Sequence, residues 1–149
     1  MEVNYMKTKR VIEPEQTEFS GLSCDLLVTP DDAEGFFNVI EIRVAPQMGA
    51  PMHISLDEYK FFKIISGNVK FYAEHKVWKL QGGDSVIIKK GDKHGFTNIG
   101  ETIATILLVS SPSRHVDFFR EMGALPTPHD PRQVMKVCER NRQQLIMPE

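Results

Sequence analysis

The stretch that decides the fold is Gly83–Asn98, GDSVIIKKGDKHGFTN. Gly83 and Gly91 flank a short apolar segment, and glycine permits tight turns at both ends of a strand. Three residues then follow at every second position: His94, Phe96 and Asn98. Because side chains alternate across a strand, these three face the same side of a sheet. The pattern predicts two short strands joined by a turn, with His94 directed inward as a metal ligand, an acid–base group or a satisfied core histidine.

Short strands separated by turns are indicated over most of the chain before Ser110. In Asn38–Val44 and Val69–Glu74, side chains alternate as expected of strands with one buried face. The sequence Ser66-Gly67-Asn68 is a hairpin-type turn signal. Weaker strand patterns cover Phe19–Val28, Lys60–Ile65, Val77–Leu80, Ser85–Ile88, His94–Asn98 and Thr102–Val109. Many short strands with glycine-rich turns favour an all-β sandwich or barrel.

After Ser110 the pattern becomes helical. Ser113 is the expected N-cap of a helix over His115–Met122, and Asp130 followed by Pro131 is typical of the start of a second helix. The second helix carries a mostly apolar stripe formed by Val134, Val137, Cys138, Asn141 and Leu145. We expect this stripe to cover the barrel or a neighbouring subunit. A DNA-reading role is disfavoured because no second helix stands at helix-turn-helix distance.

Length and charge bound the class of protein. We expect one domain over residues 1–149, with a barrel at about 10–110 and a helical extension at about 113–147. Met1 and Met6 are both acceptable start sites. The formal net charge of −2 gives no electrostatic reason to expect nucleic acid or an anionic membrane as a partner. The most apolar run, Ile103–Val109, is far shorter than the roughly 20 residues of a bilayer span.

The cellular compartment is indicated by the cysteines and the first residues. Cys24 and Cys138 are too few for a disulfide scaffold, and no apolar signal segment is present near Met1. We therefore expect two reduced cysteines and a cytoplasmic location.

The segment Gly83–Asn98 resembles the second conserved motif of the cupin superfamily, G-x5-P-x-G-x2-H-x3-N. The matching residues are Gly83, Gly91, His94 and Asn98, and Lys89 replaces the proline. The resemblance covers roughly Phe36–Ser110 and implies an antiparallel jelly-roll barrel that encloses its site. The C-terminal segment is also similar to the extension of many single-domain bacterial cupins.

The first cupin motif, G-x5-H-x-H-x3,4-E-x6-G, is matched only in part, between Gly49 and Gly67. Its first histidine is His53 and its closing glycine is Gly67, but the opening glycine stands two residues too close. The second histidine position holds Ser55, and the glutamate position holds Lys60. Cupins of this pattern hold a divalent metal through three histidines and one glutamate. The resemblance therefore implies that only two of the four ligands are retained here.

The two retained ligand positions are His53 and His94. Ser55 is a weak ligand, and a protonated Lys60 repels a metal ion. Glu58 would supply a third ligand if the strand register shifted by two residues, and a catalytic metal site needs about three. We expect no cofactor, and a divalent transition metal on His53, His94 and Glu58 is the open alternative.

Without a metal, Lys60, His53 and His94 form a potentially cationic cluster inside an apolar barrel. Such a cluster favours a carboxylate, a phosphate or an enolate. Burial would lower the pKa of an unpaired Lys60 and make its amine a base or a Schiff-base group. Alternatively, Lys60 pairs with Glu58 or Asp57, or extends to solvent at the barrel mouth.

The candidate ligand-binding residues combine this cluster with neighbouring side chains of the expected interior: His53, Ser55, Lys60, Phe62, His94 and Phe96. Core packing is the alternative role of the aromatic residues, including Phe71 and Trp78. Three further histidines are interpreted as surface residues without assigned chemistry: His75, His115 and His129.

Three functions stay open. The preferred hypothesis is a small-molecule-binding protein with an incomplete metal-ligand set and an anionic ligand. The alternative implied by the resemblance is an enzyme, either a metal-dependent dioxygenase or isomerase or a metal-free sugar epimerase or isomerase. The third hypothesis is an interaction role in which the C-terminal helix docks a partner. A homodimer, which is common among cupins, would bury the same apolar stripe.

Overall fold

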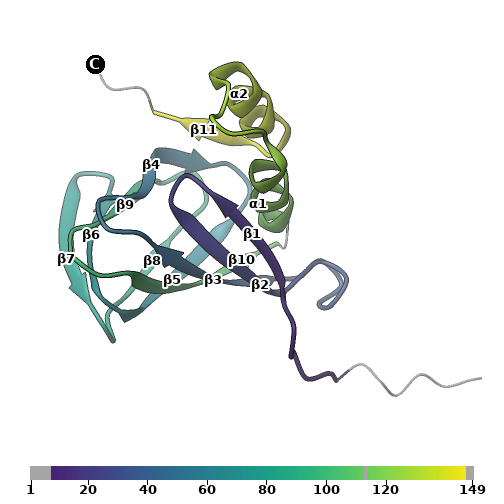
Figure 1. Ribbon diagram of the computed structural model, residues 1–149, viewed down its shortest axis with the longest axis horizontal. Coiled ribbons are helices and arrows are strands. Elements are labelled where there is room, and N and C mark those ends of the chain that lie inside the picture. The colour runs from purple at the N-terminus through teal and green to yellow at the C-terminus, as the bar shows by residue number, and fades with distance from the viewer. Residues whose placement is uncertain (1–7, 113, 147–149) are drawn as a thin grey trace, which may run out of the picture.

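The computed structural model describes residues 8–112 and 114–146 (Figure 1). The start sites Met1 and Met6 and the expected N-cap Ser113 lie outside these residues. One sheet runs in the order β1 (Glu15–Phe19), β2 (Leu22–Val28), β3 (Asn38–Val44), β10 (Ala104–Ser111), β5 (Tyr59–Ser66) and β8 (Ser85–Ile88). The other runs in the order β11 (Gln143–Leu145), β4 (Gly49–Ser55), β9 (Lys93–Asn98), β6 (Asn68–Ala73) and β7 (Lys76–Gln81).

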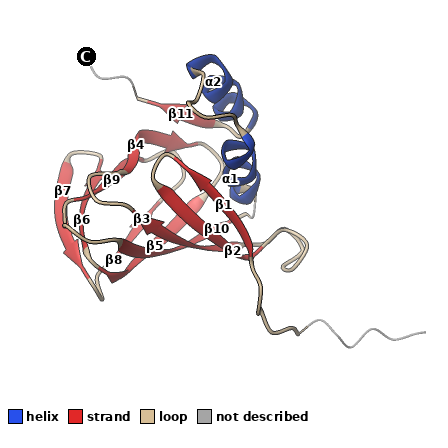
Figure 2. Ribbon diagram, viewed as in Figure 1, coloured by secondary structure: helices blue, strands red, loops and turns tan. Residues whose placement is uncertain are grey.

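All strand pairs in these two sheets are antiparallel. The sheets form two layers that enclose the core, and the helices lie at one end of them (Figure 2). The predicted all-β jelly roll with a C-terminal helical extension is confirmed. Within the described residues, the strands form two separate sheets rather than one continuous closed barrel.

The core is formed by the inward face of each strand. In β3 the buried residues are Ile40, Ile42 and Val44, which alternate with half-buried neighbours, as the sequence pattern predicts. In β5 the buried face carries Phe62 and Ile64. Removing a side chain of this size from water contributes roughly 1.5–3 kcal/mol. The alternation therefore fixes the register, because a slip by one residue would expose the whole apolar face.

The expected turn between β5 and β6 is present and depends on Gly67. This residue has a φ of +99°, and a Cβ added to it would lie 2.8 Å from the Cα of Ala104. Both the backbone conformation and the close approach exclude a larger residue without rearrangement.

The C-terminal segment forms α1 (His115–Ala124), α2 (Pro131–Arg140) and β11. The Asp130 side chain accepts a hydrogen bond from the backbone N–H of Arg132, so the predicted N-cap of α2 is confirmed. The prediction that the helical stripe reaches Leu145 is wrong. The helix ends at Arg140, Arg142 has a φ of +53°, and Leu145 pairs with β4 as a strand residue.

The two helices cover one end of the sheets. On α1, Phe119 packs edge-on against Phe19 of β1, with ring centroids 5.5 Å apart. On α2, Val137 and Cys138 are buried within the same chain. The apolar stripe therefore covers its own barrel, and the homodimer stays a prediction. Neither described helix has the length and apolar character needed to cross a membrane.

Candidate functional site

The pairing of β4 with β9 places His53 directly opposite His94. A bulge in β4 makes this possible, because the register shifts between Ala50 and His53. Pro51 lies in the bulge, where its missing N–H interrupts no ladder bond. The strands approach closely at Gly49, where an added Cβ would lie 1.9 Å from the carbonyl oxygen of Phe96. The sequence patterns do not predict β4 as a strand, since Pro51 and the bulge break its alternation.

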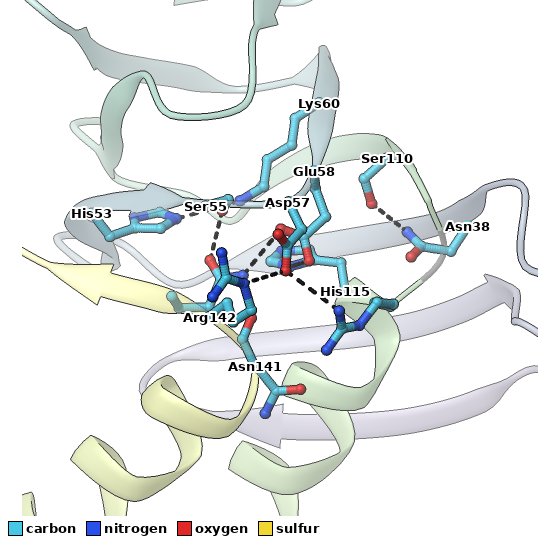
Figure 3. Close-up of polar contacts among 12 residues, drawn as sticks. Asn38, His53, Ser55, Asp57, Glu58, Lys60, Ser110, His115, Asn141 and Arg142 are labelled. Atoms are coloured by element: carbon cyan, nitrogen blue, oxygen red, sulfur yellow. Dashed lines mark hydrogen bonds and ion pairs between the residues drawn. The ribbon is translucent and has the colours of Figure 1, made fainter.

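The two histidines present the same ring nitrogen to Lys60. His53 Nδ1 lies 2.8 Å from the carbonyl oxygen of Pro51, and His94 Nδ1 lies 3.0 Å from that of Asp92. Because a carbonyl oxygen only accepts hydrogen bonds, both Nδ1 atoms carry the proton and both Nε2 atoms are acceptors. Lys60 Nζ donates to these acceptors. It lies 3.4 Å from His53 Nε2 (Figure 3). Its distance from His94 Nε2 is 3.1 Å.

Lys60 is a buried amine without a close counter-ion. Its residue exposure is 3%, and within the described residues no carboxylate lies within 4.0 Å of Nζ. Burial lowers the pKa of Lys60 to about 7, and the negative charge of Glu58 acts in the opposite direction. The expected pairing of Lys60 with Glu58 or Asp57 is therefore not formed as a direct contact.

The histidines around Lys60 are held in the neutral form. Burial, reinforced by the charge of Lys60, lowers the pKa of His53 to about 3 and that of His94 to about 2. The same two causes, with smaller contributions from the other histidines, hold the pKa of His115 well below its usual value. The only group of this cluster that changes charge near neutral pH is thus Lys60.

A second buried polar cluster lies on the side of the C-terminal extension. Ser55 Oγ donates to Gln143 Oε1 at 2.6 Å, and Gln143 Nε2 donates to Glu58 Oε2 at 3.3 Å. The other oxygen of Glu58 lies 4.0 Å from His115 Nδ1 (Figure 3). Burial raises the pKa of Glu58, with Lys60 and Gln143 opposing that shift. Gln143 lines the cavity and was missed by the sequence reasoning, because it lies in a three-residue strand within a segment predicted as helix.

The salt bridges of Asp57 attach this extension to the barrel. Asp57 Oδ2 lies 2.8 Å from Arg142 Nε and 3.4 Å from Arg114 Nη1, just before β11 and α1. One carboxylate between β4 and β5 thereby fixes the segments that carry Gln143 and His115.

The cavity enclosed by the sheets and the extension has a volume of about 180 Å³. Most of its wall is apolar, with Phe62, Phe96 and Leu108 from the sheets and Phe119, Val134 and Cys138 from the helices. The ionisable and polar groups in the wall are His53, Lys60, His115, His129, Gln143 and Ser20. The space therefore suits a small molecule with an apolar body and few polar groups.

The structure brings most of the sequence-derived site residues to this cavity. Four of them line the cavity wall: His53, Lys60, Phe62 and Phe96. His94 is not part of the wall, but its Nε2 lies 3.1 Å from Lys60 Nζ. Ser55 is 2% exposed and holds Gln143 rather than lining the space.

The structure also tests the sequence-based expectations for the other histidines and for Trp78. The interpretation of His115 and His129 as surface residues is wrong, since both line the cavity and His115 is 3% exposed. His115 could have been found from its spacing, because with Phe119 and Met122 it forms a helical stripe that is buried. His75 is exposed, as expected, whereas Trp78 is exposed by 37% rather than packed in the core.

The donor set does not fit a metal ion. Lys60 Nζ already lies within hydrogen-bond distance of the two Nε2 atoms that would serve as ligands. Within residues 8–112 and 114–146, no group of three His, Cys, Asp or Glu side chains is placed to hold a metal. The open alternative of a site on His53, His94 and Glu58 is therefore not assembled, and the expectation of no cofactor stays a prediction.

Replacing the lysine tests this interpretation directly. We expect Lys60→Glu to bind Zn²⁺ at least about 30-fold tighter than the wild-type chain, because it adds a carboxylate ligand and removes a competing ammonium. The measurement is a Zn²⁺ titration of dialysed protein against a chromophoric chelator, with Lys60→Gln as the matched control. Equal zinc affinity in the wild-type and Lys60→Glu chains would contradict the role given to Lys60.

Comparison with known proteins places the fold. The family model described as "Cupin domain" matches residues 40–110, a range close to the one that the motif resemblance covers. No curated protein sequence matches the chain.

Solved structures with the same fold include several named for enzymes. KdgF from Halomonas sp. is 12% identical, with a TM-score of 0.60 over 66% of this chain and 86% of that one. A predicted oxalate decarboxylase from Thermotoga maritima is 20% identical, with a TM-score of 0.61 over 68% and 93%. The polyketide cyclase RemF from Streptomyces resistomycificus is 18% identical, with a TM-score of 0.61 over 70% and 79%. At these identities the likeness shows the fold alone.

Proposed function

We propose that this chain, which belongs to the cupin superfamily, binds a small carboxylic acid with a largely apolar body in the cavity lined by Lys60. The observation that carries the proposal is the buried Lys60 amine, which lines the cavity without a carboxylate partner among the described residues.

The hydrogen-bonding capacity of Lys60 supports an anionic ligand. An ammonium group has three N–H donors, and the Nε2 atoms of His53 and His94 accept two of them. One donor is left for a ligand atom. Charge-assisted hydrogen bonds are roughly twice as strong as neutral ones, so a carboxylate gains most from this position.

The remainder of the cavity supports a carboxylate in preference to a phosphate. A phosphate dianion needs several cationic or N–H donors, whereas the described wall offers Lys60 as its one lysine or arginine, and its histidines His53 and His115 stay neutral. The aromatic rings of Phe62 and Phe96 exclude water from the rest of the ligand. An apolar chain on the carboxylate therefore adds binding free energy at about 25 cal/mol per Å² of buried surface.

The first test uses butyrate and its uncharged analogue butyramide. We expect butyrate to bind at least about tenfold tighter than butyramide at pH 6, because a charge-assisted hydrogen bond contributes roughly 1.5–3 kcal/mol. Isothermal titration calorimetry measures both affinities. Equal binding of butyrate and butyramide would overturn the proposal.

The pH dependence of butyrate binding follows from the same amine. Only protonated Lys60 attracts a carboxylate, and its pKa of about 7 in the free protein means that the charged fraction falls above neutral pH. The two histidines beside Lys60 do not replace the lost positive charge, since His53 and His94 stay neutral. We expect butyrate affinity to fall by about 50-fold between pH 7 and pH 9. An affinity that is constant over this range would count against Lys60 as the anchor.

A further inference from the structure

We propose that His115 is a second hydrogen-bonding group of this cavity and that the ligand is a short hydroxycarboxylic acid. The carboxylate would bind Lys60 and the hydroxyl group would bind the ring nitrogen Nε2 of His115. This inference rests on the proposed function, because it names the ligand class of the same cavity.

The unpartnered ring of His115 is the first argument. His115 is 3% exposed and lines the cavity, and neither of its ring nitrogens has a hydrogen-bond partner within the described residues. Nδ1 is enclosed by protein, so Nε2 is the nitrogen that a ligand can reach. Leaving a buried polar atom unpaired costs about 1–3 kcal/mol, so most such atoms in folded proteins have a partner. A ligand in the cavity would provide one for Nε2.

The polar groups on the barrel side do not satisfy the enclosed nitrogen Nδ1 either. Glu58 Oε1 is the nearest carboxylate oxygen, and its distance of 4.0 Å from His115 Nδ1 is too long for a hydrogen bond. The other oxygen of Glu58 accepts a hydrogen bond from Gln143, and Gln143 is in turn bound by Ser55. The network thus holds Glu58 on the barrel side and leaves His115 Nδ1 unpaired.

The position of His115 is fixed by packing rather than by polar contacts. Its ring stacks on Phe118, with centroids 5.8 Å apart, and meets Phe119 edge-on at 5.0 Å. The helix that carries it is attached to the barrel by Arg120, which forms two hydrogen bonds with Glu15 at 2.8 and 2.9 Å. A ring held in this way has lost its rotational freedom before a ligand arrives, which lowers the entropic cost of binding.

The charge around His115 selects a hydroxyl group. Its imidazole is neutral, and the carboxyl group of Glu58 lies beside it, so a second carboxylate on the ligand would be repelled or would have to be protonated. A hydroxyl group both donates and accepts hydrogen bonds, and it therefore suits either tautomer of the ring. A neutral hydroxyl at one end and a carboxylate at the other match the two polar positions of an otherwise apolar cavity.

The test compares butyrate with 2-, 3- and 4-hydroxybutyrate by isothermal titration calorimetry at pH 6. We expect at least one hydroxybutyrate to bind the wild-type chain about tenfold tighter than butyrate. We expect His115→Phe to remove this preference, so that the hydroxybutyrates bind the variant no more tightly than butyrate does, since the ring is replaced by one of similar shape and the hydrogen bond is lost.

Three control variants separate the outcomes. His75→Phe removes an exposed histidine and should keep the preference. His129→Phe removes another histidine of the cavity wall, whose Nε2 lacks a partner within the described residues. If His129→Phe removes the preference and His115→Phe keeps it, the inference about His115 is overturned. Lys60→Met should abolish binding of all four acids.

The remaining outcomes distinguish this inference from the proposed function. If butyrate binds but no hydroxybutyrate binds more tightly, the inference is overturned and the proposed function stands. If none of the four acids binds, both are overturned. Should His115→Phe fail to fold, the nitrogen resonances of wild-type His115 provide the answer. We expect the Nε2 resonance to shift with the tightest hydroxybutyrate and not with butyrate, and an unchanged resonance would overturn the inference.

Discussion

Lys60→Met is expected to stabilise the fold by about 3 kcal/mol at pH 6 and to weaken butyrate binding by at least about 100-fold. The two effects have one physical origin. Lys60 is a buried amine whose charge destabilises the free protein but contributes favourably to binding when an anion lies beside it.

The sign of the stability effect follows from proton linkage. In the unfolded chain Lys60 has its ordinary pKa of 10.5, whereas in the folded chain its pKa is about 7. Between these values the unfolded state binds more protons, so the wild-type chain gains stability as pH rises. Below about pH 7 the folded chain must hold a buried charge, at a cost on the order of 4 kcal/mol.

The loss of two hydrogen bonds reduces the stabilisation expected of Lys60→Met. The Nε2 atoms of His53 and His94 lose their donor, at about 0.5 kcal/mol each if the cavity admits water. The net stabilisation therefore stays near 3 kcal/mol at pH 6 and disappears near pH 10. Methionine has nearly the length of lysine and leaves little new space.

Urea denaturation of the wild-type and variant chains at pH 6 and pH 9 measures this effect. Lys63→Met is the matched control, because Lys63 lies on the same strand with its side chain exposed. We expect the control to match the wild type in both stability and butyrate affinity. A Lys60→Met chain that is less stable than the wild type at pH 6 would show that the amine is satisfied in the folded state.

The central cluster could be predicted from the sequence because its members come from strands with strong local patterns. His94 and Phe96 share an inward face by simple alternation, and both are buried. Lys60 follows the same rule in β5. His53 lies in a bulged strand where alternation fails, and only the motif resemblance linked it to His94.

The helix-covered wall of the cavity could not be predicted in the same way. His115 lies on a helix whose buried face shows in the sequence, but the position of that helix over the cavity depends on its packing against Phe19 of β1, which is distant along the chain. Gln143 reaches Ser55 and Glu58 through a strand of three residues. So short a strand has no periodicity of its own, and its pairing with β4 decides its conformation.

The wild-type chain is expected to lose about 4 kcal/mol of stability between pH 7.5 and pH 5. The cause is the set of neutral histidines His53, His94 and His115, whose folded-state pKa values are all lowered, chiefly by desolvation. In the unfolded chain these rings bind protons as pH falls through about 6.5. The unfolded state then holds more protons than the folded state, so stability decreases with falling pH.

The size of this loss reflects opposing contributions. Each histidine that stays neutral in the fold costs about 2 kcal/mol at pH 5 relative to high pH, which gives roughly 6 kcal/mol for three. Glu58 acts in the other direction, because its raised pKa makes the folded state bind a proton that the unfolded state releases above about 4.5. The expected net loss is therefore smaller than the sum of the histidine contributions.

The slope of stability against pH identifies the responsible residues. Unfolding of the wild-type chain at pH 5.5 should take up about two protons, and His115→Phe should reduce this number by close to one. His75→Phe, which removes an exposed histidine, is expected to follow the wild-type slope. Urea midpoints measured from pH 5 to pH 8 give the slopes. If His115→Phe and His75→Phe have the same slope, His115 is accessible to protons in the folded chain, and the neutral, unpaired ring required for hydroxyl recognition does not exist.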